Sequence, residues 1–189
     1  LTVLPGMEVQ TREEVHSLCL FNTLEQALAW QEIVDQHLPN IPNRPDYFGD
    51  QLIVDLNGDF IGKEERLLLN SVNLSLSEAF QKVTELGGLF IPAHINRTAN
   101  GLIPILGLPP VDIPIEVMEI SRHLKPAEAV KIYPFLKDYT LIQSGDAHRL
   151  EEILGLNLFT IESPTTEEIL LALRGEQNRS HRILSTTLS

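Results

Sequence analysis

The pattern of hydrophobic and polar positions predicts short strands and helices in alternation. Two strand-like runs open the chain, at residues 1–9 and 15–21. Residues 23–36 then place apolar side chains near helical spacing, directly after Asn22 and Thr23, which are residues that commonly cap a helix. The first third of the chain is therefore expected to form two neighbouring strands followed by a helix.

A second helix and strand follow the same order. Ser75 and Glu78 have the spacing of a capping box, which predicts a helix that Gly87 and Gly88 end, and the strand-like residues 89–94 come next. Further along, the pattern predicts strands at 114–120, 139–142 and 156–162, helices at 126–136 and 164–174, and a short helical turn after residue 148. Alternation of this kind favours an α/β architecture with parallel strands, as a barrel or an open doubly wound sheet.

Two segments are expected to lie outside this alternation. Residues 38–72 are rich in proline at first and then contain Asn57-Gly58 between two apolar runs, which is a strong hairpin signal, so they are interpreted as an insertion that decorates the main fold. Residues 176–189 are interpreted as a polar, partly ordered C-terminal tail, which leaves residues 1–175 as one domain.

Charge and composition argue against some classes of function. The chain has 189 residues, 43% of them hydrophobic, and a formal charge of −12. This acidity argues against a broad nucleic-acid footprint, because such affinity comes mainly from clustered positive charge. Cys19 stands alone in an apolar run, which excludes an internal disulfide and favours a buried thiol in a reducing, cytoplasmic setting. Prolines and acidic residues interrupt the most apolar window, 102–120, so no membrane segment is predicted.

Candidate metal ligands fall in or just after the strand-like segments. These residues are Glu8, His16, His94, Asp146 and His148. Ligands gather at the C-terminal ends of strands in α/β folds, and imidazole with carboxylate suits Zn, Mn or Fe. Asp146 and His148 are two residues apart, which in extended backbone would point both side chains the same way.

Two arginines are candidate phosphate ligands. Arg97 follows His94 within a turn, and its planar guanidinium suits phosphate oxygens. Arg122 has the same ambiguity between a phosphate ligand and an ordinary surface residue. The remaining histidines, which lie in helical, loop and tail contexts, are interpreted as non-ligands: His37, His123 and His181.

Three motifs in order resemble the PHP (polymerase and histidinol phosphatase) superfamily of metal-dependent phosphoesterases. The first comprises Pro5-Gly-Met-Glu-Val9 with Glu14-Val-His-Ser-Leu-Cys-Leu-Phe21, the second Ile91-Pro-Ala-His-Ile-Asn-Arg97, and the third Ser144-Gly-Asp-Ala-His148. The resemblance spans residues 1–174 apart from the insertion. It implies part of a distorted (β/α)7 barrel of the TIM-like type with two or three divalent ions at the strand C-termini.

The resemblance also implies a role for each residue. Glu8 would bridge metals, His16 and His94 would complete the ligands of one ion, and Asp146 and His148 would each serve another ion. Asp146 and Arg97 are the candidate catalytic residues, with Arg97 steadying the phosphate while metal-activated hydroxide attacks it. The family's opening H-x-H motif is absent from this sequence. The chain is therefore expected to be the C-terminal part of such a barrel, with the missing N-terminal segment as its partner.

The resulting expectation is a phosphoesterase that acts, when full length, on a small phosphorylated molecule or nucleotide, and is inactive or weak as this chain. Nucleic acid and membrane are not expected as partners. Two alternatives stay open: a non-catalytic metal- or ligand-binding domain, and a polymerase-associated 3'-5' nuclease, against which the charge of −12 counts.

Overall fold

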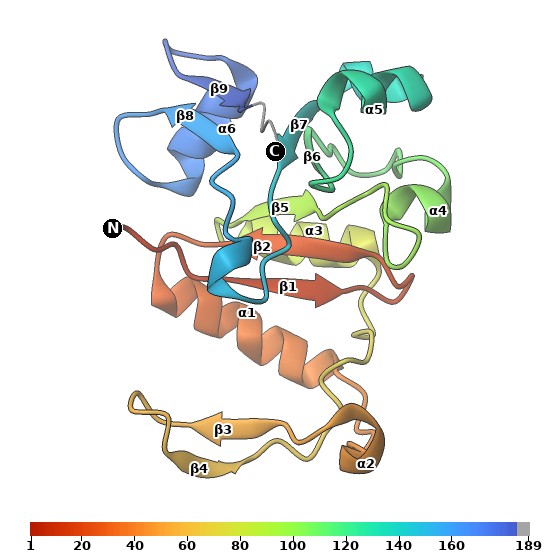
Figure 1. The fold of residues 1–189 in the computed structure, drawn as a ribbon, viewed down its shortest axis with the longest axis vertical. Helices are drawn as coiled ribbons and strands as arrows, with labels where there is room; N and C mark the ends of the chain where they lie inside the picture. Colours follow the sequence, from red (N-terminus) through yellow and green to blue (C-terminus); the bar gives the residue numbers. More distant parts are fainter. Residues whose placement is uncertain (185–189) are drawn as a thin grey trace.

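A three-stranded antiparallel sheet forms the middle of the molecule (Figure 1). The computed structural model describes residues 1–184. The sheet contains β1 (Gly6–Gln10), β2 (His16–Leu20) and β5 (Leu89–Pro92) in the order β1-β2-β5. Because both pairings are antiparallel, the C-terminal ends of β1 and β5 lie beside the N-terminal end of β2. One edge of this sheet therefore collects the residues that end β1, begin β2 and follow β5.

The sheet separates two hydrophobic clusters, as the two-residue period of a strand requires. Cys19 and Phe21 belong to a large core with the buried Trp30 of α1 (Leu24–His37), and α3 (Leu76–Glu85) contributes to the same core. Leu18 and Leu20 pack instead against a smaller cluster. Thr23 and Ser75 cap α1 and α3 in capping boxes, which confirms both predicted helix starts.

A parallel pair of strands lies beside this sheet. It comprises β6 (Val117–Ile120) and β7 (Thr140–Gln143), connected through α5 (Pro126–Ile132) and the 3₁₀ turn Pro134–Asp138. The backbone N–H of Ile95 donates to the carbonyl of Glu119 at 2.8 Å, which joins the loop after β5 to β6. A short helix, α4 (Leu102–Leu106), stands in the proline-rich segment where no helix was predicted. The C-terminal ends of β6 and β7 thus open toward the loop after β5.

The last part of the chain forms an antiparallel pair of strands that are connected through a helix. Its elements are the 3₁₀ turn Leu150–Glu152, β8 (Asn157–Thr160), α6 (Thr166–Arg174) and β9 (Ser180–Ile183). β9 pairs antiparallel with β8, so part of the predicted polar tail is a strand. The other predicted tail residues, 185–189, lie outside the described residues.

The insertion stands away from the central sheet, at the bottom of Figure 1. It contains α2 (Pro45–Phe48) and the antiparallel strands β3 (Leu52–Val54) and β4 (Phe60–Lys63) on either side of Asn57-Gly58, as the hairpin signal predicts. It returns to the main body at Ser71 and Val72. The backbone N–H of Val72 donates to the carbonyl of Gln10 at 2.9 Å.

The fold class is mixed α/β with several small sheets, so the α/β part of the prediction is confirmed. The prediction of parallel strands is wrong for most of the described pairs, because β6–β7 alone is parallel among them. A closed barrel is not formed by residues 1–184. Within the same residues, no helix combines the length and the apolar character needed to cross a bilayer.

Candidate metal centre

Three predicted ligands meet at the sheet edge where β1, β2 and the loop after β5 come together. Glu8 lies on β1 and His16 begins β2, directly opposite Gln10 in the antiparallel register. His94 follows β5, and the N–H of the preceding Ala93 donates to the carbonyl of His16 at 2.9 Å. Strand pairing therefore brings together residues that are up to 86 positions apart in sequence.

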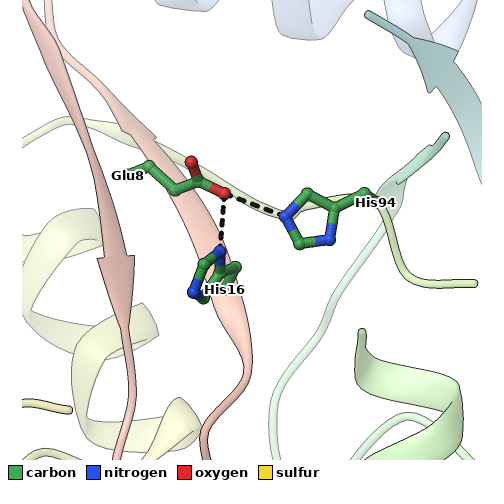
Figure 2. A group of neighbouring side chains, drawn as sticks. All are labelled: Glu8, His16 and His94. Atoms are coloured by element: carbon green, nitrogen blue, oxygen red, sulfur yellow. Dashed lines mark hydrogen bonds and ion pairs between the residues drawn. The ribbon is translucent and has the colours of Figure 1, made fainter. Parts of the chain in front are cut away.

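One carboxylate oxygen joins both imidazoles (Figure 2). Glu8 Oε1 lies 3.1 Å from His16 Nδ1 and 3.0 Å from His94 Nε2. One potential ligand atom from each residue lies within 4.8 Å of the other two. We refer to Glu8, His16 and His94 as the ligand trio.

The electrostatics of the ligand trio keep its carboxylate charged. Hydrogen bonds from His16 first and His94 second hold the pKa of Glu8 far below its ordinary value, against the smaller opposing effect of burial. The Glu8 side chain is 31% exposed and that of His94 only 1% exposed. The trio therefore offers an ionised carboxylate at a surface that solvent and ligands reach, backed by a buried imidazole.

The hydrogen bonds of His16 are compatible with a cation in the trio. Its Nε2 lies 3.1 Å from Gln10 Oε1, and Gln10 is oriented by its own amide N–H, which donates to Ser71 Oγ at 2.8 Å. A neutral imidazole carries one N–H, so if Nε2 donates to Gln10, the lone pair of Nδ1 faces the Glu8 carboxylate. A bound cation, or a second proton, removes that repulsion.

The buried ring of His94 directs its Nε2 to the same carboxylate. Its Nδ1 is buried without a hydrogen-bond partner, while Nε2 faces Glu8. A tetrahedral ion with N and O ligands at about 2.1 Å would set those ligands roughly 3.4 Å apart, close to the spacing in the trio. The donor types, the ionised carboxylate and the spacing therefore fit one divalent ion.

A fourth residue, Glu119 on β6, positions His94 and is absent from the sequence prediction. Its Oε1 accepts from the backbone N–H of His94 at 3.2 Å, and its Oε2 accepts from Ser144 Oγ. Glu119 is 2% exposed, and burial raises its pKa. His94 has a φ of 29°, an uncommon backbone conformation that such anchoring helps to hold. The available signal was a lone carboxylate within the apolar run Val117–Ile120.

The other predicted ligands lie on the loop after β7. Asp146 accepts from Arg97 Nη1, and its φ of 50° means that the backbone is not extended there, contrary to the reasoning from the Asp146–His148 spacing. The side chain of His148 is 78% exposed, and its Nδ1 lies 3.0 Å from the carbonyl oxygen of Asp146. These two residues stay outside the close contacts of the ligand trio.

Two cavities connect the loop to the trio. One of about 500 Å³ is lined by Glu8, His94, Glu119, Asp146 and His148 among others. A second of about 660 Å³, on the side of the insertion, is lined by Glu8, His16 and His148 among others. The loop and the trio thus border shared space in which a substrate group could contact both.

Comparison with known proteins adds information about the fold. No protein-family model matches the chain, and neither does any curated protein sequence. Two crystal structures are similar: the lesion-specific endonuclease PfuEndoQ from Pyrococcus furiosus, with a TM-score of 0.64, and an endonuclease Q bound to a 27-mer duplex with an abasic lesion at its active site, with a TM-score of 0.61. Each is 22% identical, over 93% of this chain and 40% of the other. The chain therefore shares its fold with less than half the length of these enzymes.

These comparisons overturn one prediction. The expectation of a small phosphorylated substrate, with nucleic acid argued against, is wrong, because both similar structures are DNA-processing endonucleases and one holds a DNA duplex. The error came from using the net charge of the whole chain. Residues 121–149 hold five Lys or Arg and three Asp or Glu, whereas the rest of the chain holds nine and 23. A positive segment thus exists within an acidic protein, and its Arg122 lines a cavity that also contains His94.

Proposed function

We propose that the chain forms the metal centre of a PHP-type phosphoesterase that hydrolyses phosphodiester bonds in DNA. The observation that carries the proposal is the meeting of one ionised carboxylate and two imidazoles on a single point, bordered by two cavities. The resemblance of three ordered motifs to PHP phosphoesterases and the fold shared with two DNA endonucleases support it. The barrel implied by the resemblance belongs to the proposal as well.

Each residue has a part in this proposal. Glu8, His16 and His94 hold the ion, and Gln10 and Glu119 orient the two imidazoles. A divalent ion bound there would polarise a phosphoryl oxygen and lower the pKa of water. The guanidinium of Arg97 pairs with Asp146, which lines the 500 Å³ cavity, and would bind the phosphate.

A second ion at Asp146 and His148 needs a change in the loop. Asp146 is occupied by Arg97 in the present arrangement, so its carboxylate would have to exchange this partner for a metal. The exchange would free Arg97 for a substrate phosphate. Zn, Mn and Fe all accept imidazole and carboxylate ligands, so the identity of the ions depends on geometry and supply.

A non-catalytic metal-binding domain is the second candidate function. The contact that favours it is again the ion pair between Asp146 and Arg97, which leaves the ligand trio as the one close group of candidate ligands within residues 1–184. Such a domain would bind one ion for stability and would cleave nothing.

Metal analysis and a cleavage assay on matched variants test the proposal. We would measure Zn, Mn and Fe in the purified chain and in Glu8→Ala and His94→Ala, with His37→Ala as a control on a histidine at the end of α1, outside the trio and the cavities beside it. The same proteins would be incubated with Mn²⁺ and a labelled DNA duplex that carries one abasic site. We expect bound metal in the wild type and the control, none in the trio variants, and cleavage that follows metal content.

The outcomes separate the two candidates. Bound metal without any cleavage would favour the non-catalytic domain. Metal content that is the same in His94→Ala and His37→Ala would reject the metal centre itself.

A further inference from the structure

A third cavity, of about 280 Å³, lies beside the metal centre and contains two guanidinium groups. It is lined by His94, Arg97, Ser121, Arg122, His123, Gly145 and Asp146. His94 is shared with the ligand trio, so the cavity adjoins the proposed metal position. It opens between the loop after β5 and the loops after β6 and β7.

Hydrogen bonds hold the walls of this cavity in place. Asn96 and Ser121 bind each other twice: Asn96 Nδ2 donates to Ser121 Oγ at 3.0 Å, and the backbone N–H of Ser121 donates to Asn96 Oδ1 at 2.8 Å. Arg122 Nη1 donates to the carbonyl of Gly145 at 3.0 Å. The three loops are therefore tied together, and the position of Arg122 is set before any ligand arrives.

The charge of the cavity suits an anion. Asp146 pairs with the guanidinium of Arg97. Arg122 forms a longer ion pair with Glu152, with 3.8 Å between Glu152 Oε1 and Arg122 Nη2, and its Nε lies 3.4 Å from His123 Nε2. The Arg122 side chain is 32% exposed, so its outer N–H groups reach solvent. A guanidinium in a fixed position, whose ion pair is long and whose outer N–H groups reach solvent, is a good ligand for phosphate oxygens.

We infer that Arg122 and the cavity around it form a subsite for a DNA phosphodiester next to the one that reacts at the metal centre. The inference rests on the proposed function and deepens it, because it assigns a strand-positioning role to a residue on the β6 side of the site. Phosphate contacts fix the register of a protein on DNA without reading its sequence. Arg122 would set which phosphodiester reaches Glu8 and His94.

The salt dependence of DNA binding tests this inference. Each phosphate that a cationic side chain neutralises adds close to one unit to the slope of log K against log salt. We would titrate the labelled abasic duplex with the chain in EDTA, which prevents cleavage, between about 50 and 200 mM salt. Arg122→Gln removes the charge but keeps an N–H donor for the Gly145 carbonyl. Arg182→Gln, on β9, is the control, since Arg182 is exposed and lines neither this cavity nor the 500 Å³ one.

We expect Arg122→Gln to bind more weakly, with a slope shallower by about one, and Arg182→Gln to match the wild type. Metal content and thermal unfolding of Arg122→Gln should equal those of the wild type. An unchanged slope in Arg122→Gln would overturn the subsite, and so would loss of metal or of stability in that variant, which would make Arg122 a structural residue.

The proposed function and the subsite fail in different ways. If the wild type cleaves DNA with Mn²⁺ but its slope does not depend on Arg122, the subsite alone is wrong. If the wild type binds DNA with an Arg122-dependent slope but never cleaves it, the proposed function is wrong, and Arg122 is a DNA-phosphate contact without a reacting phosphodiester beside it. If the wild type neither binds nor cleaves, both are wrong.

Discussion

The ligand trio and the Asp146–His148 loop are two halves of one candidate site that are built in different ways. Glu8 and His16 are held by the ladder of β1 and β2. His94 is held by the backbone hydrogen bonds of its neighbours Ala93 and Ile95 to β2 and β6. Asp146 and His148 lie on a loop, where Asp146 binds Arg97 and His148 is largely exposed. Strand pairing has already fixed the first group for an ion, whereas the second group must rearrange.

This difference predicts which residues should supply most of the metal affinity. Preorganised ligands lose little conformational freedom on binding, so the trio should supply most of the affinity for the first ion. The loop should contribute to chemistry and to further ions more than to that first affinity.

Removal of His94 should have the largest effect on metal affinity. His94→Ala deletes a direct ligand, so we expect the affinity for Mn²⁺ or Zn²⁺ to fall by more than the roughly 10- to 100-fold that the loss of an outer-shell partner costs. Titration with isothermal calorimetry would measure it, with His37→Ala as the control. Equal affinities in the two variants would contradict the assignment of the trio.

Removing the support of His94 should have the next largest effect. Glu119→Ala leaves the buried N–H of His94 and the hydroxyl of Ser144 without their acceptor, which should cost about 1–3 kcal/mol of unfolding free energy. We expect metal affinity to fall by about tenfold, as for other outer-shell changes. Glu119→Gln keeps a carbonyl acceptor and should restore most of both. Urea unfolding and calorimetry would show whether this rescue occurs; equal loss in both variants would argue against a positioning role.

The trio should also leave a trace in acid unfolding of the metal-free protein. Hydrogen bonds from His16 and His94 lower the pKa of Glu8, so the stabilisation from the charged carboxylate is present above the ordinary carboxyl pKa of about 4.3 and is lost as pH falls toward the lower value of the folded state. Between about pH 5 and 3, the unfolding temperature of the wild type should therefore fall more steeply than that of Glu8→Gln. Parallel curves in the presence of a chelator would contradict this prediction.

The smallest effect on metal affinity is expected from a change in the Asp146–His148 loop. Asp146→Asn alters the loop but none of the trio, so the affinity for the first ion should change by less than about threefold. Calorimetry under the conditions used for His94→Ala would measure this change. A loss as large as that of His94→Ala would show that the loop is already part of the first metal site.

The sequence singled out the trio because its members lie in or just after apolar, strand-like runs and fall in the motifs that resemble the PHP superfamily. It could not predict strand direction, since the two-residue period is the same in parallel and antiparallel sheets, and so the parallel sheet was expected where β1, β2 and β5 are antiparallel. Gln10 and Glu119 were missed because their roles depend on contacts with His16 and His94 that only the folded chain creates.

The conformation of Asp146 was out of reach for a related reason. Loops take their backbone angles from the surrounding tertiary contacts, here those of Arg97 and Arg122, and not from local residue preferences alone. The cationic stretch at residues 121–149 was visible in the sequence, but it gained meaning only once the fold placed Arg122 beside His94.

The return of the insertion at Ser71 has a consequence for anyone who redesigns this protein. Ser71 accepts from the amide of Gln10, which in turn orients His16, so the insertion ends one hydrogen bond away from a candidate ligand. The hairpin of β3 and β4 could be shortened or replaced by another segment without altering these two hydrogen bonds. A deletion that removed Ser71 would free the Gln10 side chain to rotate. A change intended only for the insertion would then lower the affinity for metal.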